Sequence, residues 1–372
     1  MDGYDVVVIG AGPAGSTASA ILAESGINTL LIDKKTLPRQ KTCGGAVSKK
    51  ALSVLDAAGI DVPKLKTFKK CSSIQVGVFD SDSVENLVDI KVNNEVAYLI
   101  DRDEFDYALT QDAVSKGAEL KQKSAIKDIE KENTGFIIKG AGFSIKSRYV
   151  LCADGVCGTS AELLGFRDRW SSENVGLCIE SEITGYNPPP SPINFYFGGG
   201  GVGWGYAWFF DKSGRASVGV GTVLKDASNL RQLFNSFIKN CSGINPDRNL
   251  EIGAWMVPGT GGIKKDLSNG NALLLGDAAG LVDPFLGEGI SYAIQSGKIA
   301  AECIINNEIR DYNKRVGEEI TNNLRYARFL VEIAKINPKR FIKLFSDDEE
   351  IWRSYVGLAL GDSTYKQFLK NI

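Results

Sequence analysis

The sequence contains no histidine, and this absence excludes several kinds of chemistry. Catalytic triads with an imidazole base are impossible, and so are metal sites with histidine ligands. Any proton transfer must therefore use a carboxyl group, a thiol, a tyrosine, a lysine or water. We predict no metal site.

An excess of charge and long apolar runs are also missing. Lys and Arg total 43 against 45 Asp and Glu, a net charge of −2, which excludes nucleic acid as a partner. No run reaches the ~18 apolar residues that would span a membrane. Residues 1–5 lack the basic region of a signal peptide, and the seven cysteines follow no repeated spacing. We therefore expect a cytoplasmic protein without a disulfide framework, with room for peripheral contact at a membrane surface.

The chain opens with a β-α-β unit. A strand at 5–9 leads through a glycine-rich turn into a helix at 14–24, and a strand follows at 28–32. This order is typical of a parallel sheet. A helix is expected at 104–116, and strands follow around 119–129, 135–139 and 149–153.

Later segments have a different pattern. Short β-branched runs at 74–78 and 96–100, and an aromatic, glycine-rich stretch at 175–223, favour an antiparallel sheet. A buried strand at 272–275 then leads into a helix at 289–306, and the C-terminus is helical in pattern.

These patterns predict an α/β fold (α+β overall) of about two domains. A Rossmann-like dinucleotide-binding domain is expected from the separated segments 1–71, 100–165 and 266–310. An inserted antiparallel-sheet substrate domain is expected from 72–99 and 166–265. Residues 311–372 are expected to form a helical C-terminal region.

Residues 10–15 read Gly-Ala-Gly-Pro-Ala-Gly, a Gly-x-Gly-x-x-Gly motif between a strand and a helix. Gly10 permits a tight turn, Gly12 lets the backbone approach a pyrophosphate, and Gly15 allows the helix to pack closely on the strand. The helix begins at Pro13 and Ala14, so its N-terminal amide groups would face the phosphates.

Asp33 follows Gly15 by 18 residues and ends the second strand, with Lys34 beside it. A carboxylate at this place accepts a hydrogen bond from an adenosine ribose and disfavours a 2′-phosphate. The motif alone therefore predicts FAD or NAD and argues against NADP.

Two further strands end in acidic turns. Residues 273–280 read Leu-Leu-Leu-Gly-Asp-Ala-Ala-Gly, followed by Asp-Pro-Phe-Leu-Gly-Glu-Gly-Ile at 283–290, and residues 151–156 read Leu-Cys-Ala-Asp-Gly-Val. With the first motif, and in this chain order, these segments resemble the FAD-binding set of glutathione-reductase-like flavoproteins. The resemblance is to the branch that contains aromatic hydroxylases and geranylgeranyl reductases, and it implies that FAD is the cofactor.

The resemblance also implies roles for individual residues. Asp277 would bind the ribityl chain, and the helix that begins near Gly289 would stabilise negative charge on the reduced flavin. Arg102 would contact the phosphate or ribityl side, and the backbone of Ala125 would meet adenine. The other residues implied at the cofactor are Asp154, Gly155, Gly287 and Ile290.

Residues 41–45, Lys-Thr-Cys-Gly-Gly, resemble the Cys-Gly signature of geranylgeranyl reductases. Gly44 and Gly45 would allow the backbone to approach a flat ligand closely. The resemblance implies that Cys43 lies beside the flavin.

Residues 203–211 resemble the Pro-x-x-Tyr-x-Trp-x-Phe-Pro pattern of archaeal geranylgeranyl reductases. Tyr206, Trp208 and Phe210 match, whereas Gly203 and Asp211 stand in the places of the two prolines. The match implies that Tyr206 and Trp208 lie near the flavin and the substrate. Four more aromatic residues are expected to complete an apolar slot for a polyprenyl chain: Phe195, Tyr196, Phe197 and Trp255.

We therefore predict a FAD-dependent reductase of isoprenoid C=C bonds that acts on geranylgeranyl chains of archaeal lipids or a related prenyl substrate. Cys43, Tyr206 and Trp208 are the predicted catalytic residues, and Cys43, Tyr206, Glu288 or an ordered water would supply the proton. No second Gly-x-Gly-x-x-Gly has a strand and helix around it, so the electron donor could be NAD(P)H that docks transiently, ferredoxin or a quinol. Two alternatives stay open: a flavin monooxygenase or halogenase, and an electron-transfer or quinone-linked flavoprotein.

Overall fold

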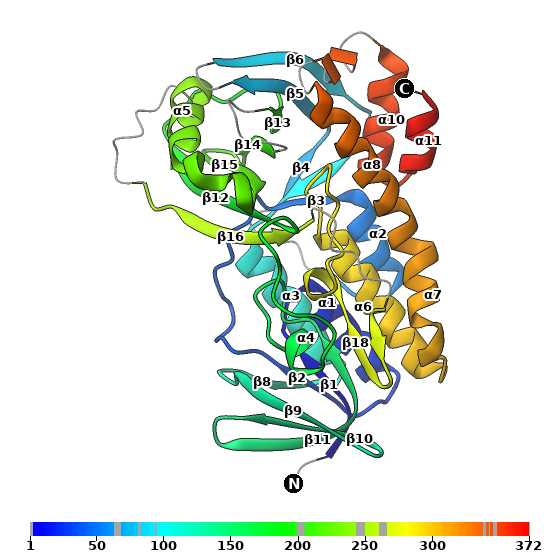
Figure 1. The fold of residues 1–372 in the computed structure, drawn as a ribbon. Helices are drawn as coiled ribbons and strands as arrows, with labels where there is room; N and C mark the ends of the chain where they lie inside the picture. The colour runs from blue at the N-terminus through cyan, green and yellow to red at the C-terminus, as the bar shows by residue number, and fades with distance from the viewer. Residues whose placement is uncertain are drawn as a thin grey trace.

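The computed structural model describes residues 3–62, 68–80, 83–93, 95–198, 205–242, 250–259, 266–337, 340–341, 343–344 and 348–371. These residues form a largely parallel sheet with helices on it, a second and mostly antiparallel sheet, and a group of C-terminal helices (Figure 1). The predicted fold class is confirmed. The exact domain boundaries stay a prediction.

The first sheet has the order β17-β18-β11-β1-β2-β8, and β10 and β9 extend it from β11 as an antiparallel hairpin. Its central strands are apolar on both faces, as in β1 from Val6 to Ile9, because helices and other segments cover both sides. The strands are β1 (Gly3–Ile9), β2 (Thr29–Ile32), β8 (Glu119–Lys121), β9 (Ile126–Glu132), β10 (Gly135–Gly140), β11 (Phe143–Cys152), β17 (Ser268–Asn269) and β18 (Ala272–Leu274).

The strands predicted around 119–129 are β8 and β9, and a turn separates them. Between them Lys123 has a φ of 55°, and the backbone turns back toward the end of β2. The amides of Lys123 and Ser124 donate to the carbonyls of Lys35 and Asp33 at 3.2 and 3.0 Å. This contact places Ala125 beside the turn that carries Asp33.

Helix α1 (Pro13–Glu24) packs on β1 and β2, and the helices α3 (Arg102–Ser115) and α6 (Ile290–Ile305) pack on α1. Small residues let α1 and α6 approach closely. A Cβ atom on Gly297 of α6 would lie 2.4 Å from the carbonyl oxygen of Ala14, so only glycine fits there. The short helix α4 (Ser160–Leu163) follows β11.

The second sheet has the order β16-β12-β15-β14-β13-β5-β6. All neighbours in it are antiparallel except β5 and β13, which are parallel. Helix α5 (Leu230–Ser242) covers one face of this sheet. The strands are β5 (Ser73–Asp80), β6 (Ser83–Lys91), β12 (Val175–Thr184), β13 (Ile193–Phe197), β14 (Gly205–Asp211), β15 (Arg215–Val223) and β16 (Gly253–Pro258).

A small sheet in the order β3-β7-β4 joins segments far apart in the chain: β3 (Ala46–Ser48), β4 (Lys69–Cys71) and β7 (Ala97–Leu99). Helix α2 (Lys49–Ala57) follows β3 and packs on α6. The C-terminal helices are α7 (Tyr312–Val316), α8 (Asn322–Ile336), α10 (Glu349–Leu360) and α11 (Tyr365–Asn371). They lie along one side of the molecule, at the orange to red end of the colour bar (Figure 1).

The C-terminal helices share a hydrophobic core with the second sheet. Leu330 of α8 and Tyr355 of α10 belong to the same buried cluster as Trp208 and Phe210 of β14. None of the helices built from described residues has the length and apolarity needed to cross a membrane.

Candidate functional site

A cavity of about 800 Å³ is lined by residues from both main sheets. One side is formed beyond the carboxyl ends of β1 and β2, the usual binding place in a parallel α/β sheet. The cavity brings together nearly all residues predicted to bind the cofactor or to act in catalysis: Gly10, Gly12, Pro13, Ala14, Asp33, Lys34, Cys43, Gly44, Gly45, Arg102, Ala125, Asp154, Gly155, Tyr206, Trp208, Asp277, Gly287, Gly289 and Ile290.

Gly15 is the exception, because it is not on the cavity wall. A Cβ atom there would lie 2.0 Å from the carbonyl oxygen of Gly10, so the residue serves the packing of α1 on its own turn. Gly10 has a φ of 107°, and a Cβ atom on it would lie 2.3 Å from the carbonyl oxygen of Ala153. Both glycines are therefore required by the shape of the turn.

The N-terminus of α1 is open toward the cavity. Its N-cap, Gly12, provides no side-chain cap, and a Cβ atom on Gly12 would meet only Arg39 Nη2, at 3.7 Å. The first amide groups of the helix are thus left for an anionic ligand.

Asp33 is buried at the end of β2 and organises the adjacent turn. Its Oδ2 accepts from the amide of Ala11 at 3.0 Å and its Oδ1 from the amide of Lys35 at 2.8 Å. These bonds hold the carboxylate on the cavity wall, next to Lys34.

Two arginines lie near this end of the cavity. Arg102 lines the cavity, but its Nε and Nη2 both bond to Asp106 at 2.9 Å. Arg39, which the motifs do not reveal, lies with Nε 3.7 Å from Asp33 and Nη1 3.5 Å from Asp106. Since Arg39 also faces Gly12, it adds positive charge where the pyrophosphate is expected.

Asp154 has a structural role. Its Oδ1 accepts from Ser160 Oγ at 2.6 Å and its Oδ2 from the amide of Ser160 at 3.0 Å. Burial raises the pKa of this carboxyl. The carboxylate thus fixes the start of α4 while Gly155 lines the cavity.

A second helix N-terminus, that of α6, faces the other part of the cavity. Its N-cap, Gly289, also provides no side-chain cap, and a Cβ atom on it would lie 3.3 Å from Asp277 Oδ1. Gly287 has a φ of 69°, and a Cβ atom on it would lie 1.9 Å from the hydroxyl of Tyr206. Glu288 accepts from Ser48 Oγ, and burial raises the pKa of its carboxyl.

Residues 43–45 cross the cavity against the aromatic strand β14. A Cβ atom on Gly44 would lie 2.6 Å from the ring of Phe210 and 3.1 Å from Trp208 Nε1. Gly45 has a φ of 82°, and its Cβ would lie 2.2 Å from the carbonyl oxygen of Ile100. No larger residue fits at either position without a shift of the chain.

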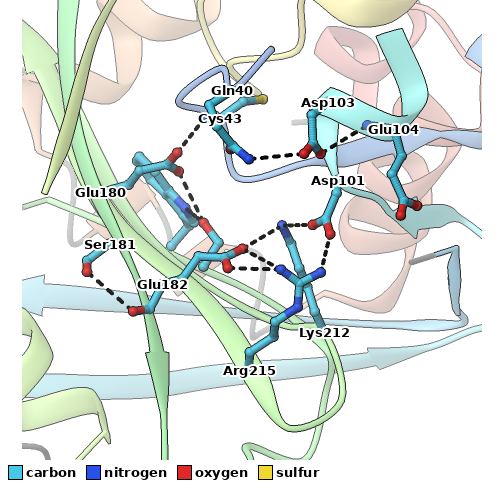
Figure 2. A network of polar contacts seen from close by, with 12 residues as sticks. Gln40, Cys43, Asp101, Asp103, Glu104, Glu180, Ser181, Glu182, Lys212 and Arg215 are labelled. Carbon is cyan, nitrogen blue, oxygen red and sulfur yellow. Dashed lines mark hydrogen bonds and ion pairs between the residues drawn. The ribbon is translucent and has the colours of Figure 1, made fainter. Parts of the chain in front are cut away.

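Glu180 of β12 links this segment to β14, and no motif had revealed it. One oxygen of its carboxylate accepts from the amide of Cys43, and the other accepts from Ser217 Oγ at 3.2 Å. Ser217 Oγ in turn accepts from Trp208 Nε1 at 3.0 Å. Burial raises the pKa of Glu180. Figure 2 shows Glu180 directed at Cys43.

Next to Glu180 an ionic network joins the two layers (Figure 2). Lys212 Nζ lies 3.1 Å from Asp101 and 3.4 Å from Glu182, and Arg215 also pairs with both carboxylates. Asp101 is the N-cap residue of α3, whereas Lys212 and Arg215 lie at the turn between β14 and β15. The network therefore holds this turn against the start of α3.

Aromatic side chains form the apolar part of the wall. Phe195, Tyr206, Trp208 and Phe210 line the cavity, and Tyr355 of α10 closes it from the C-terminal helices. Burial raises the pKa of Tyr206 well above its usual value.

Part of the predicted slot is wrong. Tyr196 points to the opposite face of the sheet and packs on Phe237 of α5, because neighbouring residues of a strand alternate in direction. Phe197 is not on the cavity wall but stacks on Phe285, with ring centroids 5.6 Å apart. Phe195 and Trp255 do line the cavity, and Gly203 lies outside the described residues.

Lys41 is a second cation whose place in the cavity was not predicted, although it belongs to the motif at 41–45. It lines the cavity, and its Nζ lies 4.7 Å from the ring centroid of Trp255. Burial and the nearby Arg102 lower its pKa. In the described part of the chain, no group of three or more Cys, Asp or Glu side chains is placed to hold a metal ion.

The cavity has the features that FAD requires. Two uncapped helix N-termini open into it, and glycines leave room at both. Cations lie at the first N-terminus, and an apolar aromatic surface adjoins the second. A dinucleotide with a flat, apolar-faced ring matches this order of groups.

Comparisons with known proteins agree with this reading. Residues 3–194 match a family model described as FAD binding domain. An uncharacterised protein of Methanosarcina barkeri is 32% identical over 89% of this chain and 83% of its own length. Digeranylgeranylglycerophospholipid reductase 1 of Methanococcoides burtonii is 30% identical over 87% of this chain and 83% of its own.

Among solved structures, a geranylgeranyl bacteriochlorophyll reductase-like protein from Thermoplasma acidophilum superposes with a TM-score of 0.82. It is 25% identical, and the match covers 100% of this chain and 98% of that one.

Proposed function

The chain belongs to the geranylgeranyl reductase family of FAD-dependent oxidoreductases, and from this premise we propose that it reduces C=C bonds of prenyl chains. The proposed substrate is a geranylgeranyl chain on an archaeal-type lipid or a related isoprenoid. The main observation that supports this proposal is that one cavity is lined both by the glycine-rich cofactor turn and by an aromatic wall.

When bound, FAD supplies the hydride, carried at N5 of its reduced form. An isolated C=C bond has no carbonyl to polarise it, so the second carbon needs a proton from the protein or from water. The protein must therefore hold a proton in a dry, apolar place.

The cavity offers such groups without a histidine. Burial raises the pKa of Glu288, which favours the protonated, donating form of its carboxyl group, and the Tyr206 hydroxyl also carries a proton because burial raises its pKa. Cys43 lies on the same wall. We propose that one of these three residues, or a water held by them, delivers the proton.

Trp208 has a positioning role in this proposal. Its indole N–H donates to Ser217, and its ring lies against Gly44. Together with Phe195 and Phe210 it would keep the prenyl chain extended along the wall. The cofactor contacts inferred for Asp277, Arg102, Ala125 and the other predicted residues belong to the same proposal.

The reductant and the cellular setting are also proposals. NAD(P)H, ferredoxin or a quinol would reduce the flavin from outside the described cavity. A prenyl-lipid substrate is drawn from a bilayer, so we place the protein in the cytoplasm with peripheral contact at the membrane.

The test begins with the flavin spectrum of the purified protein. The flavin is reduced anaerobically with dithionite, and geranylgeranyl lipid is added. Reoxidation by the lipid, with a product heavier by two hydrogens for each double bond, supports the proposal. Reduced flavin that reoxidises only with oxygen or with a quinone contradicts it and favours a monooxygenase or an electron carrier.

Two variants sharpen this experiment. Tyr206→Phe removes the hydroxyl but keeps the ring, so it slows reoxidation if Tyr206 donates the proton. Tyr196→Phe makes the same change on the opposite face of the sheet and is the matched control.

A further inference from the structure

The outer face of helix α8 exposes large apolar side chains that do not pack against the rest of the fold. Its inner face, with Leu324, Leu330 and Val331, is buried in the core. Its outer face carries Phe329, which is 58% exposed, and Ile336, which is 85% exposed. A helix on the surface of a soluble fold normally presents polar residues to solvent.

The comparison with α5 makes the difference clear. The inner residues of α5, such as Phe234 and Phe237, are buried, and its outer residues Arg231 and Lys239 are polar and exposed. Of the five large apolar side chains exposed in the described residues, four lie between Tyr326 and Leu344. The large apolar side chains exposed in the described residues are thus concentrated on α8 and the residues that follow it.

Basic side chains surround these exposed apolar residues, which we call the apolar strip: Tyr326, Phe329, Ile336 and Leu344. Residues 322–344 contain six Lys or Arg and one Glu, in a chain whose net charge is −2. Arg325, Lys335 and Arg340 are exposed, and the single acid, Glu332, pairs with Lys335 at 2.8 Å. We call Tyr326, Phe329 and Ile336, with Arg325, Lys335 and Arg340, the α8 patch.

We propose that the α8 patch seats the protein on an anionic lipid bilayer, with the apolar side chains in the interface and the cations at the headgroups. An amphipathic helix with apolar and basic residues binds in this way. The inference locates the membrane contact and rests on the proposed function only for its purpose, since a prenyl-lipid substrate would come from that bilayer.

A second copy of the chain fits this face less well. A two-fold dimer would set the same patch against itself, so the cations of one copy would meet those of the other. Stable interfaces also bury about 800 Å² on each partner, whereas the strip exposes only a few apolar side chains. Anionic headgroups complement the charge, and a single layer of inserted side chains suffices.

The position of α8 suits this role. Its inner face shares a core with Trp208 and with Tyr355, and Tyr355 lines the cavity. Figure 1 shows α8 beside α10 and α11 on the C-terminal side of the molecule. Seating on α8 would therefore bring the aromatic end of the cavity near the lipid surface.

The test is flotation of the FAD-loaded protein with vesicles of saturated phosphatidylglycerol and phosphatidylcholine, which contain no prenyl chain to reduce. We expect binding that rises with phosphatidylglycerol content and falls with salt. The variant Phe329→Ser with Ile336→Ser should lower the partition coefficient by about tenfold or more. Arg325→Glu with Arg340→Glu should lower it by at least about 25-fold, at about fivefold for each cation lost.

Matched controls keep the result interpretable. Val114→Ser changes an exposed apolar residue of α3, and Arg231→Glu with Lys239→Glu changes two exposed cations of α5. Both controls should bind like the wild type, and all variants should retain the flavin spectrum.

Several outcomes would overturn the inference. Wild-type protein that does not float with phosphatidylglycerol, or α8 variants that bind as well as the controls, would do so. A dimer in sedimentation that the Phe329 and Ile336 changes dissociate, without a change in vesicle binding, would assign the face to a second copy. Vesicle binding needs no turnover, so the inference can stand even if prenyl reduction fails.

Discussion

Replacing Glu180 with alanine tests how the cavity holds its two functional segments together. The carboxylate accepts hydrogen bonds from the amide of Cys43 and from Ser217 Oγ. Alanine leaves the partly buried Cys43 amide without this acceptor. A buried donor without a partner costs about 1–3 kcal/mol of the free energy of unfolding.

Glu180→Gln separates the hydrogen bond from the charge. Its amide oxygen can still accept from Cys43, so we expect the free energy of unfolding of this variant to stay near that of the wild type. Glu182→Ala is the control, because it lies on the same strand but is exposed, and its ion pairs contribute at most about 1 kcal/mol.

The assay combines urea unfolding with the flavin spectrum and the single-turnover rate of flavin reoxidation by prenyl lipid. Loss of the anchor should shift the flavin absorbance bands and slow reoxidation in Glu180→Ala, with recovery in Glu180→Gln. If Glu180→Ala matches Glu182→Ala in stability, spectrum and rate, the anchoring role of Glu180 is refuted.

Three further changes give distinct expectations. Gly10→Ala forces a Cβ atom to 2.3 Å from the carbonyl of Ala153 at a φ of 107°, so the purified protein should be colourless or should bind FAD much more weakly, as fluorescence titration would measure. Gly287→Ala places a Cβ atom 1.9 Å from the hydroxyl of Tyr206 and should slow reoxidation by lipid while FAD binding persists; equal rates would show that the Tyr206 ring is free to move. Burial raises the pKa of Asp283 to about 6, above its value in the unfolded chain, so the folded state binds more protons between these values. The wild type should therefore lose about 2 kcal/mol of unfolding free energy relative to Asp283→Asn as pH rises from about 4 to 7, and parallel urea-unfolding curves would contradict this.

The cofactor half of the cavity could be predicted because its requirements are local. Turns such as the one at Gly10 need glycine for backbone reasons, and they follow strands whose apolar runs are easy to recognise. Chain order then brings the turns to one edge of a parallel sheet. The glycines of these turns and the apolar runs before them can therefore be recognised in the sequence alone.

The remainder depends on contacts between distant segments. Glu180 is one acidic residue in an alternating strand, and only the packing of β12 against residues 43–45 gives it a role. Arg39 lies in a loop without a motif, and the Cys-Gly signature at 41–45 assigns no role to Lys41. Tyr196 was predicted wrongly because composition does not tell which residues of an aromatic strand face which side.

The contact between Gly297 and Ala14 has a consequence for cofactor choice. It locks α1 to α6 through a glycine that does not line the cavity, and both helices present their N-termini to that cavity. The distance between the N-termini of α1 and α6, which both stabilise anions, is therefore set by the point at which the two helices cross. A cofactor must be long enough to reach from one end to the other, so a mononucleotide would leave one helix dipole unmatched. Selectivity for a dinucleotide can thus reside in a glycine that never touches it.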